Sequence, residues 1–95
     1  MLQINWQEVY MPYERIEVEC YSGVKVNERP VIFQFRNRRW EVVEILDRWY
    51  EGGIEPGRPA LDYFKVRTRE GRIFLLRYNC LFDAWAVRTP VEELQ

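Results

Sequence analysis

The sequence predicts an all-β protein, a small antiparallel meander of five or six strands that is strongly curled or closed as a small barrel. Apolar and polar residues alternate with a period of two in several short runs, as they do in strands with one buried face. Aromatic residues make up 16% of the chain, and together with valine and isoleucine they suit a pleated, half-buried surface. Short turn signals separate the runs, and curling lets a small sheet remove its exposed edges.

The 95 residues fit a single β domain, 1–95, with short extensions at 1–12 and 90–95. The first extension alternates like a short strand until Pro12 stops it. The first clear strand is 13–21, because Ile16, Val18 and Cys20 fall on one face and polar residues on the other. Ser22-Gly23 then predicts a turn, and 24–29 a connector that ends at Pro30.

The central stretch, 30–50, predicts a long hairpin. Asn37-Arg38 is predicted to be its two-residue loop, because asparagine tolerates positive φ. That register pairs Phe35 with Trp40 and gives a core face made of Val31, Phe33, Phe35, Trp40 and Val42. The pair Val42-Val43 breaks the period, which indicates either a bulge or a lower half buried on both sides.

A second hairpin follows a glycine- and proline-rich loop at 51–59. Its predicted strands are 63–68 and 72–78, closed by Glu70-Gly71. This register places Phe64, Val66, Thr68, Ile73 and Leu75 on one face and Tyr63, Lys65, Arg67, Phe74, Leu76 and Tyr78 on the other. After a turn at 79–83, a last short strand is predicted at 84–88.

Composition excludes several kinds of catalytic and metal site. The chain has no histidine, so Ser-His-Asp and Cys-His catalysis and the usual histidine-containing zinc sites are excluded. Cys20 and Cys80 lie far apart without a CxxC spacing, and they are interpreted as two small, partly buried thiols, with a disulfide or a reactive site as the alternative. Neither a membrane span nor a secretory signal is evident. We therefore expect a cytoplasmic protein with no metal or cofactor.

Basic residues gather in the body of the chain. The net charge is −1, but residues 29–90 hold twelve basic against eight acidic side chains, and twelve of the fourteen basic residues are arginine. If the strands run alternately up and down, the two hairpin turns lie at one end of the barrel. That end, which we name the arginine end, collects Arg36, Arg38, Arg39, Arg69 and Arg72, with Arg88 at the end of the last strand.

Like charges that face each other destabilise a hairpin. An anionic partner such as phosphate would relieve the repulsion, and so would the chain's own Glu17, Glu19 and Glu70. A second candidate site is the mixed face of Tyr63, Lys65, Arg67, Phe74 and Tyr78, since single-stranded nucleic acids bind to aromatic rings interleaved with cations. The alternative is that Phe74 and Leu76 form a second core layer, with Tyr63 and Tyr78 at its rim.

A third candidate lies at the opposite end, where Asp47, Arg48, Trp49 and Tyr50 precede the glycine-rich loop and Trp85 is a potential neighbour. An ion pair beside exposed rings and a loop could form a pocket for a ligand or peptide. Equally, Asp47 could form a turn with Arg48 as its structural partner. The carboxylates at Glu41, Glu44, Asp47 and Glu51 do not converge on one point, so we do not expect an enzyme.

Several strings resemble a family of small uncharacterised bacterial proteins: IEVECYSGVKVNERPVIF, EILDRWYE, YFKVRTREGRIFLLRYN and DAWAV. The resemblance covers about residues 16–87, with Val24, Glu70 and a longer stretch at 52–60 as departures. It implies no activity, but it marks as pattern-bearing Cys20, Tyr21, Asp47, Arg48, Trp49, Tyr63, Phe64 and Lys65. A weaker similarity, from Asp47 onward, links the chain to C-terminal domains of accessory proteins of translesion DNA polymerases.

Together these observations predict a non-enzymatic binding module that contacts a partner protein or another copy of itself, through an exposed strand edge or the Trp49 end. The alternative is a nucleic-acid-binding accessory domain that uses the arginine end and the mixed face.

Overall fold

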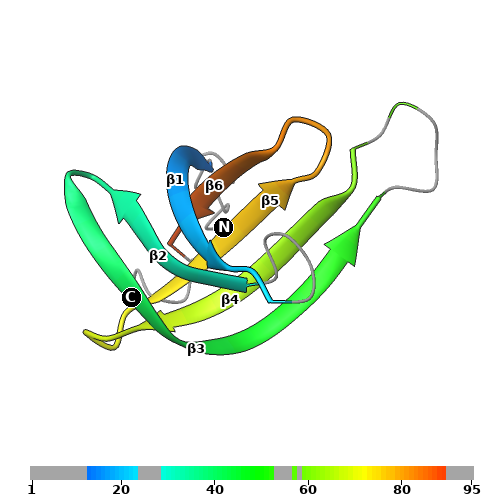
Figure 1. The fold of residues 1–95 in the computed structure, drawn as a ribbon. Coiled ribbons are helices and arrows are strands. Elements are labelled where there is room, and N and C mark those ends of the chain that lie inside the picture. Colours follow the sequence, from blue (N-terminus) through cyan, green and yellow to red (C-terminus); the bar gives the residue numbers. More distant parts are fainter. Residues whose placement is uncertain (1–12, 24–28, 53–56, 58, 90–95) are drawn as a thin grey trace, which may run out of the picture.

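The computed structural model describes residues 13–23, 29–52, 57 and 59–89, and these form an all-β barrel (Figure 1). The predicted strand at the N-terminus, the connector at 24–28, most of the glycine-rich loop and the acidic tail lie outside the described residues. No helix that could cross a membrane occurs in the part of the chain that is described. The strands are β1 (Glu14–Tyr21), β2 (Arg29–Phe35), β3 (Arg38–Glu51), β4 (Leu61–Thr68), β5 (Ile73–Asn79) and β6 (Ala84–Arg88).

Each strand pairs with the next in antiparallel fashion, and β1 pairs with β6 to close the barrel, as the sequence predicts. β1 divides its pairing along its length. Its first residues, from Glu14 to Ile16, pair with β6, and those from Glu17 to Tyr21 pair with β2. Figure 1 shows β1 as a strongly curved strand beside β6, with the long, bent β3 on the other side of the molecule.

The core is an aromatic cluster centred on Phe74. The ring of Phe74 lies edge-on to Phe33 at 5.3 Å, to Trp40 at 4.9 Å and to Phe35 at 5.8 Å, measured between ring centroids. Each such aromatic pair contributes about 0.5–1.5 kcal/mol beyond the area that it buries. The other buried members of the cluster come from β4, β5 and β6, and they are Phe64, Val66, Leu76, Trp85 and Val87.

The first hairpin turns one residue earlier than predicted. Arg36 and Asn37 form its loop, with φ of 52° and 61°, the backbone of a type I′ turn. Phe33 therefore lies opposite Trp40, whereas the prediction placed Phe35 there. The register differs by two residues, and because side chains alternate with a period of two, Phe33, Phe35, Trp40 and Val42 keep the predicted face. Val31 is not among the residues that pack against the core cluster.

The bulge predicted at Val42-Val43 is present. The register between β3 and β4 shifts between Val42 and Glu44, and Val43 is 51% exposed, which contradicts burial on both sides. A second, unpredicted shift follows between Ile45 and Asp47. Such irregularities bend a strand and increase its twist, and they help β3 to curve around the barrel.

The second hairpin corrects a prediction. Its loop has three residues, because Thr68 N–H donates to the Arg72 carbonyl at 2.8 Å and Gly71 N–H donates to the Thr68 carbonyl at 2.8 Å. Gly71 adopts a φ of 88°, which a residue with a side chain rarely does. The prediction of a two-residue loop was wrong by one residue, and this error exchanges the inner and outer faces of β5. Phe74, Leu76 and Tyr78 point inward, and Ile73 and Leu75 join the outer face.

The register of β5 predicts unequal costs for two adjacent truncations. We expect Phe74→Ala to lower the free energy of unfolding by about 3–5 kcal/mol, because it removes the central ring of the core. Leu75→Ala, on the outer face, should cost about 1 kcal/mol. Urea denaturation followed by circular dichroism measures both, and a larger loss for Leu75→Ala would contradict the observed register.

Candidate functional site

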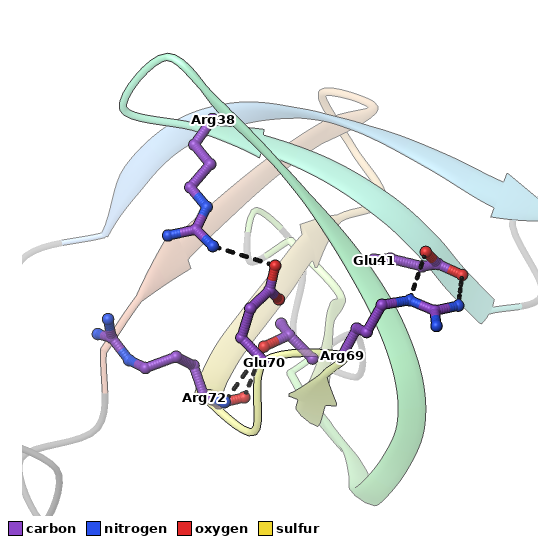
Figure 2. Close-up of polar contacts among 6 residues, drawn as sticks. Arg38, Glu41, Arg69, Glu70 and Arg72 are labelled. Carbon is purple, nitrogen blue, oxygen red and sulfur yellow. Dashed lines mark hydrogen bonds and ion pairs between the residues drawn. The ribbon is translucent and has the colours of Figure 1, made fainter.

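The two hairpin turns lie at the same end of the barrel, as the meander predicts. Arg38, beside the first turn, donates through Nη2 to Glu70 Oε2 in the second turn, at 3.1 Å (Figure 2). The arginine end therefore exists as a physical cluster.

Much of the charge at this end is already neutralised. Arg69 donates through Nε and Nη2 to the two carboxylate oxygens of Glu41, at 3.0 and 2.8 Å (Figure 2). Hydrogen bonds from Arg69 lower the pKa of Glu41 below its ordinary value. Arg36 pairs with Glu14 at 2.8 Å. Three of the five arginines at this end thus hold a carboxylate of the chain itself.

These partners differ in part from the expected ones. Glu70 serves as predicted, but Glu14 and Glu41 take the places that the prediction gave to Glu17 and Glu19. Glu17 and Glu19 lie opposite Gln34 and Ile32 of β2, and neither makes an ion pair with a described arginine.

The other two arginines differ in their surroundings. The Arg72 guanidinium carbon lies 5.7 Å from the ring centre of Trp40 and 5.3 Å from that of Phe74. Arg38 also covers Trp40, at 4.1 Å. Both guanidinium groups lie over aromatic rings of the core, and their positive charge is attracted to the faces of those rings. Arg39 is exposed and lies opposite Gln34 on the outer surface.

The predicted mixed face is wrong in its membership. Tyr63, Lys65 and Arg67 do belong to the outer face of β4, although Tyr63 is covered by neighbouring rings, but Phe74 and Tyr78 are on the inner side of the neighbouring strand. The one-residue error in the hairpin loop is the physical cause, because it exchanges the faces of β5. Arg67 pairs with Glu44.

Tyr63 has little surface to offer a ligand, with 8% of it exposed. Its ring stacks on Trp49 at 5.1 Å with an interplanar angle of 4°, and Tyr13 approaches it edge-on at 6.4 Å. Arg77 covers Tyr13 at 4.0 Å from the ring centre. The predicted exposed ring of Trp49 is therefore half-buried in an outer aromatic stack.

The Asp47–Tyr50 string is divided between two faces. Arg48 points inward and donates through Nε and Nη2 to Asp62, at 3.1 and 2.7 Å, and through Nη2 to the Tyr50 hydroxyl at 3.2 Å. The Asp62 bonds raise the pKa of Arg48 above its ordinary value. Asp47 accepts the Arg48 backbone N–H at 2.8 Å.

Arg48 thus has a structural partner, as one of the two readings held, but that partner is Asp62. The aspartate is 5% exposed, and sequence reasoning did not single it out. Its spacing gave a signal, because Asp62 shares the inner face with Phe64 and Val66. The Arg48 guanidinium lies 4.6 Å from the ring centre of Phe64, which in turn packs against Trp85 at 5.6 Å.

The turn between β5 and β6, residues 80–83, carries two exposed apolar side chains that the sequence analysis did not single out. Leu81 is 65% exposed and Phe82 is 70% exposed. Asn79 Oδ1 accepts the backbone N–H groups of both, at 3.0 and 3.2 Å. Tyr78 donates its hydroxyl to Asp83 at 2.6 Å. The turn is therefore held in shape while its two largest side chains face solvent.

A groove of about 810 Å³ adjoins this turn, and we name it the β1 groove. Residues 15–18 of β1 line one side, residues 83–85 line the other, and Gln34 contributes from β2. Cys20 lies further along β1. Burial, followed by the charge of Asp83, raises the pKa of its thiol to about 11, so Cys20 is a poor nucleophile at neutral pH. Cys20 and Cys80 are both free thiols.

Comparison with protein-family models, curated proteins and solved structures finds no match to this chain. The family resemblance noted in the sequence therefore stays a prediction.

The Arg48–Asp62 pair predicts a clear contrast between two aspartates. We expect Asp62→Asn to lower the free energy of unfolding by about 2 kcal/mol, because a partly buried guanidinium loses its counter-charge. Asp47→Asn keeps an oxygen for the Arg48 backbone and should change stability by less than about 0.5 kcal/mol. Chemical denaturation at neutral pH measures both variants, and equal losses would show that the pair adds nothing specific.

Proposed function

We propose that this domain is a non-enzymatic interaction module that docks a partner protein through the β5–β6 turn. The observation that carries the proposal is the exposure of Leu81 and Phe82 on a turn fixed by side-chain hydrogen bonds. Single exposed apolar residues are common on protein surfaces. Two adjacent ones on an ordered turn, beside a groove, are a better candidate for a docking site.

A turn that is already ordered favours binding, because less conformational entropy is lost when a partner docks. The bonds from Asn79 and between Tyr78 and Asp83 supply this order without using Leu81 or Phe82. Both apolar side chains are thus free to be buried by a partner, each with a contribution of about 1.5–3 kcal/mol as an upper bound.

The alternative function, nucleic-acid binding at the arginine end, has weaker support. A phosphate that approached Arg36, Arg38 or Arg69 would have to compete with a glutamate already paired to that arginine. The mixed face lacks two of its predicted rings, and Arg67 is paired with Glu44.

Substitution of the turn tests the proposed docking site. We expect the double variant Leu81→Ser, Phe82→Ser to lose a partner protein that the wild-type domain captures from an extract of its source cells. Val43→Ser, an exposed apolar change elsewhere, should retain it. Isothermal titration with the purified partner should then show at least about a tenfold weaker affinity for the double variant. An unchanged affinity would contradict the proposal. Analytical ultracentrifugation of the purified domain would show whether the partner is a second copy of the chain.

Oligonucleotide binding tests the alternative. At about 50 mM salt, labelled single-stranded and duplex oligonucleotides should bind the wild-type domain with a dissociation constant above roughly 100 µM by fluorescence anisotropy. The variant Glu41→Gln, Glu70→Gln should bind more tightly, because it releases Arg69 and Arg38. Micromolar binding by the wild type that weakens at about 200 mM salt and is lost in Arg38→Ala would favour the nucleic-acid function instead.

A further inference from the structure

One edge of β1 pairs with no described residue over part of its length. Residues 17–21 pair with β2 on one side, but pairing with β6 ends at Ile16. Among the described residues, no further pair joins β1 to β6 beyond Ile16 and Trp85, and no backbone hydrogen bond runs from residues 17–20 to the β5–β6 turn. An unpaired strand edge presents N–H and C=O groups on which another chain can add a strand.

The β1 groove lies along the start of this edge. Its walls are residues 15–18 and residues 83–85, so the free edge and the proposed docking turn border the same space. Inner-face side chains such as Val18 and Trp85 give the groove apolar contacts. A strand placed there would lie next to Asp83, which follows Leu81 and Phe82 in the chain.

The charge beside the edge is mainly acidic. Glu17 and Glu19 are exposed on the outer face of β1, and neither makes an ion pair with a described residue. Asp83 adds a third carboxylate across the groove, against Arg15 at its near end. Cross-strand pairs of opposite charge stabilise a sheet, and like charges directly opposite destabilise it.

We infer that the partner contributes an extended, basic segment that adds as a strand to the free edge of β1 in the β1 groove. Lysine or arginine at alternate positions would face Glu17 and Glu19, and the intervening apolar residues would face Val18 and Trp85. A second copy of β1 fits less well, because its glutamates would face these glutamates. This inference rests on the proposed function and names the chemistry of its partner.

Short synthetic peptides test the inference directly. The probe is a fluorescein-labelled peptide of roughly seven alternating lysine and valine residues, the length of a short strand. Controls are the glutamate–valine equivalent and the lysine–valine peptide with proline at its centre, which cannot donate to the edge. At about 50 mM salt, we expect both controls to bind at least about tenfold more weakly than the probe by anisotropy.

Charge reversal on the protein places the site. In Glu17→Lys, Glu19→Lys the preference should invert, so that the glutamate–valine peptide binds more tightly than the lysine–valine peptide. The matched variant Asp47→Lys, Glu51→Lys makes the same change of net charge at exposed positions away from the groove, and it should keep the wild-type preference. Amide hydrogen exchange measured by NMR should slow, when the probe is bound, at the alternate residues among 17–20 whose N–H groups point away from β2.

Each result decides the inference. Inversion with slowed exchange supports strand addition. An unchanged preference in Glu17→Lys, Glu19→Lys, equal binding of the proline peptide, or no binding of the probe at all would overturn it. The proposed function is judged separately. If the purified partner still requires Leu81 and Phe82 while the probe fails, the docking turn stands and strand addition falls. If the probe binds as expected while the purified partner does not require Leu81 and Phe82, strand addition stands and the docking turn falls.

Discussion

Closure of the barrel through β1 is the constraint on which the rest of the structure depends. A sheet of six strands in so short a chain would otherwise leave two edges open and the core face of β6 uncovered. β1 closes the barrel because it pairs with two neighbours along its length, with β6 as far as Ile16 and with β2 from Glu17. Within the described part of the chain, the same division leaves part of one edge without a paired strand, so the free edge next to the β1 groove is a geometric consequence of how the barrel closes.

The two hairpins show how far a period-two pattern determines a β structure. Both loops were misplaced in the sequence analysis, but with unequal effect. In the first hairpin the register moved by two residues, and Phe33, Phe35 and Trp40 kept their face. In the second it moved by one, and Phe74 exchanged sides with Leu75. Both are large apolar residues, so alternation could not correct the error, and only the backbone of the loop around Gly71 fixes the face.

The candidate sites were predictable to the extent that topology places them. The meander alone indicated that the two turns meet, and Arg38 and Glu70 do meet there. Which carboxylates neutralise the arginines depends on register and on side-chain reach, and these selected Glu14 and Glu41. The burial of Asp62 was missed because its partner, Arg48, lies 14 residues away along the chain and pairs with it only across strands. The exposure of Leu81 and Phe82 has no periodic signature at all.

The two ends of the barrel differ in which groups they leave without partners in the molecule, and this difference supports the proposal that the β5–β6 turn is the docking site. At the arginine end, ion pairs and ring contacts use most of the charge within the molecule. At the β5–β6 turn, Asn79 accepts the backbone N–H groups of Leu81 and Phe82, and Asp83 accepts the Tyr78 hydroxyl. The turn would keep those bonds with polar residues at positions 81 and 82. Leu81 and Phe82 are largely exposed there, and this exposed apolar surface gains free energy only when another molecule covers it.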